Sequence, residues 1–148
     1  MKCKTISLII DSDIEYIPLI GPIVNKLCST ISFSNSDSYK IELCVVEAVT
    51  NCIKHAYNNS RGHNIEIIFE IYPKELIIRV CSYGKKMGKK EQNFLKAEKV
   101  EFEDIDDINK IPDSGRGLMI IKSIMDHVTY ESKEGKNCLV MIKKLPFP

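Results

Sequence analysis

The clearest pattern of apolar and polar positions lies between Ile41 and Asn58, where apolar residues recur every three or four positions. This spacing predicts an amphipathic helix, and Ser36 and Asp37 just before it can cap its start. A solvated outer face is the usual reason for a polar stripe, but Asn51 is a poor residue for the middle of a helix. The stripe consists of Glu47, Asn51, Lys54 and Asn58, with His55 at its edge.

Alternating patterns predict strands on both sides of this helix, and helical spacing predicts two further helices. In the first of these helices, Gly21-Pro22 is expected to kink the helix or delay its start. Strands are predicted at 2–10, 63–72, 75–82, 128–132 and 137–144, and helices at 17–31, 41–58 and 117–126.

Residues 83–114 show poor periodicity and high charge. A connection this long inside a compact domain is usually functional or mobile. We therefore expect a mobile lid at about 84–114, with one short helix near Glu91–Glu98. Four lysines follow Gly84 closely, and they either attract anions or form a disordered basic loop.

The order of these elements predicts a two-layer α/β sandwich over a single domain, 1–148. Its sheet is mostly antiparallel, with helices on one face, because two layers are the natural way to bury one face of each element.

Composition narrows the class of protein. The chain has 148 residues, 44% hydrophobic residues and a net charge of +1, so nothing favours bulk binding to nucleic acid or to a membrane. Its N-terminus lacks a signal peptide, and no apolar run reaches membrane length, so we expect a cytoplasmic protein. The six cysteines are scattered without a C-x-x-C pair, and we interpret them as reduced and buried.

The polar stripe and a later glycine motif suit a bound nucleotide. Gly115-Arg116-Gly117, placed before an apolar helix, offers close backbone approach and helix-end amides to phosphates. Asn51 offers an oxygen to Mg²⁺, and Glu47 one turn earlier can act as a general base. Lys54 and Arg116 are candidate phosphate cations, the alternative being solvated surface charges.

These motifs carry a family resemblance. The run E-A-x-T-N-x-x-K-H-A-Y from Glu47 to Tyr57 resembles the N box of GHKL-type ATPases, and that of bacterial anti-sigma-factor serine kinases in particular. The G-x-G-L run, 115–118, followed by a late helix, resembles the second half of the family pattern. The resemblance spans nearly the whole chain and implies the Bergerat α/β sandwich fold.

The resemblance also implies a site and its ligands, ATP and Mg²⁺. It gives Asn51 the role of metal ligand and Glu47 that of general base, with His55 as a structural neighbour of the nucleotide. The family's adenine-binding D-x-G aligns with Ser82-Tyr83-Gly84, so Ser82 stands where the Asp is expected. An uncharged Ser82 can cost about 1–3 kcal/mol of binding. The implied nucleotide-binding set is Asn51, Lys54, His55, Ser82, Gly84, Gly115, Arg116, Gly117 and Leu118.

The resemblance implies an ATP-dependent protein serine kinase that acts as an anti-sigma factor. Its partners would be a sigma factor and a small anti-anti-sigma protein of the STAS type, phosphorylated on Ser or Thr. A homodimer is implied too, and an exposed first strand would suit edge pairing. The alternative is a divergent, non-catalytic binding module with weak or no ATP binding, which Ser82 favours. A sensor histidine kinase fragment is disfavoured, because the chain begins directly with the first strand.

Overall fold

A five-stranded antiparallel sheet organises the computed structural model, which describes residues 3–97 and 113–146. The strand order is β1-β2-β3-β5-β4, so β1 and β4 form the two edges. The strands are β1 (Lys4–Asp11), β2 (Asn64–Ile71), β3 (Glu75–Ser82), β4 (His127–Lys133) and β5 (Lys136–Lys144), and every neighbouring pair is antiparallel.

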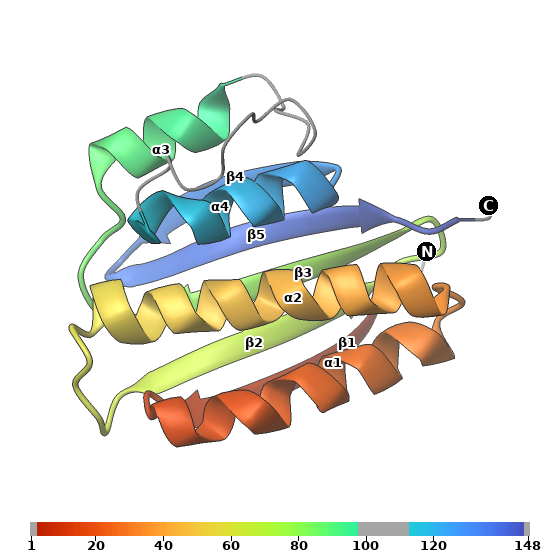
Figure 1. Cartoon of the computed structure of the whole chain (residues 1–148), viewed down its shortest axis with the longest axis horizontal. Helices are drawn as coiled ribbons and strands as arrows, with labels where there is room; N and C mark the ends of the chain where they lie inside the picture. Colours follow the sequence, from red (N-terminus) through yellow and green to blue (C-terminus); the bar gives the residue numbers. More distant parts are fainter. Residues whose placement is uncertain (1–2, 98–112, 147–148) are drawn as a thin grey trace.

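The helices lie on one face of this sheet, with α1, α2 and α4 side by side and α3 beyond α4 (Figure 1). The α/β two-layer sandwich predicted from the sequence is confirmed. None of the helices formed by residues 3–97 and 113–146 is long and apolar enough to cross a membrane. They are η1 (Ile14–Tyr16), α1 (Ile17–Thr30), α2 (Asn35–Asn51), η2 (Cys52–Ala56), α3 (Lys89–Lys96) and α4 (Asp113–Ile124).

The core lies between the inner face of α2 and the covered face of the sheet. Alternate residues of β2 and β3 point toward the helices, as their period-two pattern requires. Burying a side chain of this size contributes roughly 1.5–3 kcal/mol. The central residues are almost completely buried: Ile41, Val45 and Val49 of α2, Ile65, Ile67 and Phe69 of β2, and Leu76, Ile78 and Val80 of β3.

The organising helix begins earlier than predicted. Its N-cap is Ser34, whose hydroxyl accepts a hydrogen bond from the Asp37 N–H at 3.1 Å. Ser36 and Asp37 therefore lie inside the helix and do not cap it. The polar residues before Ile41 include several that can cap a helix. Ser38 is one of them, but it is fully buried within the helix, so the helix begins upstream of it.

Of the other two helix starts, that of α1 agrees with the expected residue and that of α4 differs. Helix α1 begins at Ile17 and runs through Pro22, so Gly21-Pro22 does not delay it. Gly21 is needed there because a Cβ at this position would lie 2.5 Å from Glu42 Oε1 of α2. Helix α4 begins at Asp113, which places Gly115 and Gly117 inside the helix and not before it.

The expectation that all six cysteines are reduced is wrong for two of them. Cys81 and Cys138 form a disulfide between β3 and β5. The strand register places them directly opposite each other, with their Cα atoms 4.1 Å apart. They are 57 residues apart in the chain, so spacing gives no sign of this pairing. Cys3, Cys28, Cys44 and Cys52 are free.

The first part of the predicted lid packs against the sheet edge and α4. Helix α3 agrees with the short helix expected near Glu91–Glu98. Leu95 of α3 is buried, and the Lys122 ammonium of α4 donates to the Phe94 carbonyl and lies 4.7 Å from the Phe94 ring centroid. The rest of the expected lid, 98–112, lies outside the described residues.

Candidate functional site

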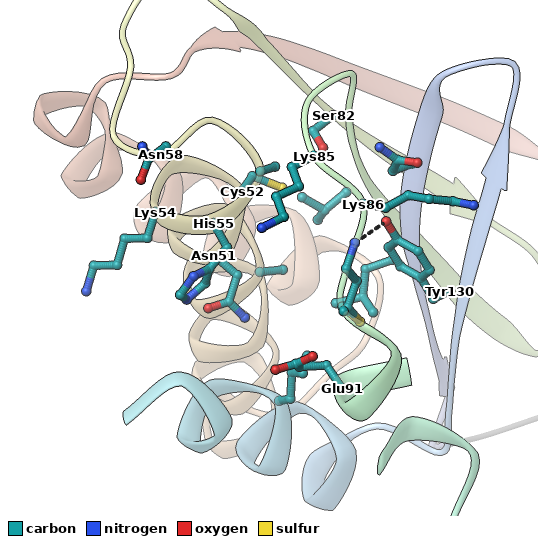
Figure 2. Close-up of a pocket in the computed structure, with 18 residues that line it drawn as sticks. Asn51, Cys52, Lys54, His55, Asn58, Ser82, Lys85, Lys86, Glu91 and Tyr130 are labelled. Atoms are coloured by element: carbon teal, nitrogen blue, oxygen red, sulfur yellow. Dashed lines mark hydrogen bonds between the residues drawn. The ribbon is translucent and has the colours of Figure 1, made fainter. Parts of the chain in front are cut away.

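A cavity of about 530 Å³ opens between the C-terminal end of α2, the loop after β3 and the ends of β4 and β5. In Figure 2, Ser82 lies at one end of the cavity, while Asn51 and Glu91 lie toward the other. Its described lining comes from seven elements, so it forms only when the sheet and helices are assembled. Lys85, Lys86, Met87 and Gly88 of the loop after β3 line it from the side facing α2.

The predicted polar stripe reaches this cavity through an altered helical turn. After Asn51 the α-helix changes to a π-helix over Cys52–Ala56, and the Tyr57 N–H bonds to the Cys52 carbonyl at 3.0 Å. Asn58 then adopts a left-handed φ of 50°, so the helix ends before the predicted boundary. Single π-turns in helices are frequent at functional sites. Asn51, Lys54, His55 and Asn58 all line the cavity.

Glu47 and Asn51 meet the glycine motif of α4. A Cβ built on Gly117 would lie 2.7 Å from Glu47 Oε2 and 3.5 Å from Asn51 Nδ2. A larger residue at position 117 would displace the Glu47 carboxylate from its present place, whereas its contact with Asn51 would be ordinary. The structure thus brings together Glu47, Asn51 and Gly117, which the sequence placed in two separate motifs, although Glu47 is not itself among the described lining residues.

Gly84 packs against the π-helical turn that lines the cavity. It packs so tightly on the Ala56 carbonyl and the Tyr57 ring that a Cβ would overlap both, and the neighbouring Lys85 N–H donates to the Ala56 carbonyl at 2.8 Å. The Tyr57 hydroxyl accepts from the Tyr83 N–H and donates to the Asn64 carbonyl, each at 2.7 Å. These contacts fix the π-helical turn against the end of β3.

We call the part of the cavity that is lined by Cys52, Ser82 and Asn137 its floor. Ser82 and Asn137 are directly opposite each other in the pairing of β3 with β5 and are 3% and 5% exposed. Burial raises the pKa of Cys52 to about 12, and a hydrogen bond with the Ser82 side chain opposes that rise. The Cys52 side chain is therefore a neutral thiol at neutral pH, and the floor carries no charge.

Several residues of the site lie outside the sequence motifs and were not predicted. Asn137 donates from Nδ2 to the Gly84 carbonyl at 3.0 Å and accepts from the Ser132 hydroxyl at 2.6 Å. The Tyr130 hydroxyl accepts from the Met87 N–H at 2.9 Å. Asn137 is a polar residue at an inward-facing position of β5. That position is the one feature of the sequence that could have identified it as a site residue.

The remaining predicted residues lie around the same region. Leu118 of α4 lines the cavity and is 3% exposed. Arg116 is half-buried in the first turn of α4 and is not among the described lining residues. Gly115 belongs to the same turn.

Asn51 fits the ligand chemistry of Mg²⁺. Within residues 3–97 and 113–146 no group of three His, Cys, Asp or Glu side chains could hold a metal ion. Mg²⁺ does not require such a cage, because it takes one or two protein oxygens and completes its shell with phosphates and water. The Asn51 amide oxygen at the cavity wall, with the Glu47 carboxylate one turn away, is a donor set of this kind.

The fold and the cavity together define a class of nucleotide-binding α/β sandwich. The sequence pattern of the histidine kinase-like ATPase domain matches residues 10–143, and the chain belongs to this family.

Within the family, the chain is similar to proteins named serine-protein kinase RsbW. The protein of Staphylococcus epidermidis is 31% identical over 82% of this chain and 75% of its own length. The protein of Bacillus thuringiensis is 27% identical over 94% of this chain and 84% of its own length. The protein of Oceanobacillus iheyensis is 25% identical over 88% of this chain and 79% of its own length.

Proposed function

We propose that this protein is an ATP-dependent protein serine kinase that acts as an anti-sigma factor. The observation that carries the proposal is the close approach of Gly117 to both Glu47 and Asn51. It brings the first turns of α4 to a carboxylate and an amide on one face of α2. A general base, a metal-binding oxygen and an anion-binding helix end are what phosphoryl transfer asks of a protein.

In the proposed reaction, Glu47 takes the proton from a serine or threonine hydroxyl of the substrate protein. The freed oxygen forms a bond to the γ-phosphorus while the bond to the ADP oxygen breaks. The phosphoryl group ends on the substrate, ADP leaves, and the proton rests on the Glu47 carboxylate until solvent removes it. Mg²⁺ held by Asn51 would neutralise phosphate charge when bound.

The phosphates would lie between α4 and the loop after β3. The positive end of the α4 dipole, at the turn that holds Gly115 and Gly117, favours an anion. Lys54, Lys85 and Lys86 contribute side chains at the exposed edge of the cavity. Residues 84–97, the described part of the predicted lid, would cover this end of the nucleotide.

The proposed substrate is a small STAS-type anti-anti-sigma protein, and the proposed client is a sigma factor in the cytoplasm. The names of the similar RsbW proteins, which describe serine-protein kinases, support the reaction type. The direct test is transfer of radiolabelled phosphate from ATP to a serine of a cognate anti-anti-sigma protein. Absence of transfer to any serine or threonine of a partner that binds would contradict the proposal.

A second candidate function is a binding module that holds its partner without catalysis. The neutral floor favours it, because Ser82 replaces the carboxylate that the family uses for adenine. Titration calorimetry with Mg-ATP separates the two functions. Measurable binding favours the kinase, whereas partner binding without nucleotide binding favours the module.

We also propose that the protein is a homodimer that pairs through β1. Strand β1 is an edge strand of the sheet that the described residues form, and strand edges tend to add a further strand. Ile6 and Ile9 of β1 are 44% and 65% exposed, and Leu19 and Ile23 of the adjacent α1 are 61% and 43% exposed. An apolar edge of this kind suits a second copy of the chain.

A further inference from the structure

The two ends of the cavity differ in charge and in exposure. Lys54, Lys85 and Lys86 are exposed at its mouth, and the one acidic residue among its described lining, Glu91, lies well away from Ser82 (Figure 2). The floor is neutral and lies between apolar walls formed by Val80, Leu118 and Leu139, all nearly fully buried. Phosphates need the charged mouth, and an aromatic base needs an apolar slot with few polar groups. The base of a nucleotide would therefore bind at the floor.

The floor can both donate hydrogen bonds to a ligand and accept them from it. A serine hydroxyl is both a donor and an acceptor, and its hydrogen rotates to suit the partner. Asn137 is held by the Gly84 carbonyl and the Ser132 hydroxyl, which leaves one of its two N–H groups as a further donor. A carboxylate in the place of Ser82 would only accept, so it would favour an amino group and repel an oxo group.

We propose that this cavity takes 6-oxopurine nucleotides on nearly equal terms with adenine nucleotides, and that Ser82 is the residue that sets this relaxed selectivity. The inference rests on the proposed nucleotide-dependent function. Sites discriminate strongly between analogues when a mismatch leaves buried polar groups unpaired. The Ser82 hydroxyl shares a hydrogen bond with the Cys52 thiol, and either group can be the donor. The hydroxyl can therefore accept from a 6-amino group while it donates to the thiol, or donate to a 6-oxo group while it accepts from the thiol, so neither purine leaves it unpaired.

The test compares the binding of Mg-ATP and Mg-ITP to the full chain by titration calorimetry, since the two bases differ at the 6-position and its adjoining ring nitrogen. Mg-CTP reports binding through the phosphates alone. We expect the ATP and ITP dissociation constants to agree within about tenfold, with CTP at least about tenfold weaker than both.

Substitutions at Ser82 sharpen the comparison. Ser82→Asp should create a preference for ATP over ITP of at least about a hundredfold, whereas Ser82→Ala should weaken both without changing their ratio. ATP binding with ITP more than about a hundredfold weaker in the wild type would overturn the inference and leave the kinase proposal standing. CTP binding as tight as ATP would overturn the assignment of the floor to the base. Failure of every nucleotide to bind would overturn the proposed function as well.

Discussion

Gly117 of α4 lies against Glu47 of α2, so that a Cβ at position 117 would be 2.7 Å from Glu47 Oε2. Gly117→Ala should therefore force Glu47 or the start of α4 to move. We expect Mg-ATP to bind about tenfold or more weakly, because the Glu47 carboxylate must turn away. The free energy of unfolding should change by less than about 1 kcal/mol, since the end of a flexible side chain can move and alanine is favoured over glycine within a helix. Calorimetric titration and urea unfolding measure the two effects.

Gly21→Ala is a matched control for this variant. It creates a similar conflict, 2.5 Å from Glu42 Oε1, between α1 and α2, and neither Gly21 nor Glu42 is among the described residues that line the cavity. This variant should show a similarly small change in stability and keep its affinity for nucleotide. Equal loss of affinity in both variants would mean that Gly117 acts through general stability and not through the site.

Asn51→Ala tests the proposed metal ligand. The variant should fold normally and lose about ten- to a hundredfold in affinity for Mg-ATP, because a contact to a charged group is removed. The loss should disappear when Mg²⁺ is chelated. Asn25→Ala serves as control, since Asn25 is another half-buried helical asparagine, bonded to Glu42 at 3.2 Å in the packing of α1 on α2. Equal Mg-ATP binding by wild type and Asn51→Ala would rule out the metal assignment.

Ile9→Lys tests pairing of two copies through β1. The side chain is 65% exposed, so the monomer should remain folded. In a symmetric dimer each substitution acts twice, and two lysines in place of apolar contacts should weaken dimerisation by about a hundredfold or more. Sedimentation equilibrium gives the dissociation constant. Tyr39→Lys on α2, 67% exposed, should leave it unchanged; a wild type that is monomeric at all concentrations would refute the pairing.

Three cysteine thiols make stability fall in alkaline solution. Burial raises the pKa of Cys28, Cys44 and Cys52 from 9.0 to about 12. Glu42 adds to the rise at Cys28 and Glu47 to the rise at Cys44, whereas Lys143 opposes it at Cys44. Between these values the unfolded chain loses the three protons and the folded chain keeps them, so stability is full below pH 9 and declines above it. Each thiol should contribute up to about 1.4 kcal/mol per pH unit.

Urea unfolding at about pH 8, 9 and 10 measures this decline. In a Cys28→Ala, Cys44→Ala double variant, the free energy of unfolding should be lower at every pH. Its decline with pH should be less steep, because the folded and unfolded chains then differ by about two fewer bound protons. An equally steep decline in that variant would show that other groups cause the alkaline loss.

The periodicity of apolar residues was sufficient to predict the sheet and the layer of helices. Helix and strand patterns depend on local spacing, and burial of Val45 and Ile67 follows from that spacing directly. Boundaries were less predictable, because several polar residues before Ile41 could cap the helix and the structure uses Ser34. The start of α4 at Asp113 was missed because nothing apolar marks its first turn.

The site was predictable only where its residues share a motif. Asn51, Lys54, His55, Ser82 and Leu118, which the sequence singled out, all line the cavity. Asn137 and the Cys81–Cys138 disulfide were not foreseen, because both depend on the register of β3 with β5, and register between distant strands leaves no mark in local spacing. The contact of Gly117 with Glu47 depends in the same way on the packing of α4 on α2.

The central claim is that Glu47 is the general base of a protein kinase, and Glu47→Gln tests it most directly. Glutamine keeps the size of the side chain but cannot take the substrate proton. We expect near-normal Mg-ATP binding and transfer of radiolabelled phosphate to the partner's serine reduced by about 10²–10⁴-fold relative to wild type. Transfer by Glu47→Gln at the wild-type rate would show that Glu47 is not the base, and a wild type that binds its partner without transferring phosphate would contradict the kinase itself.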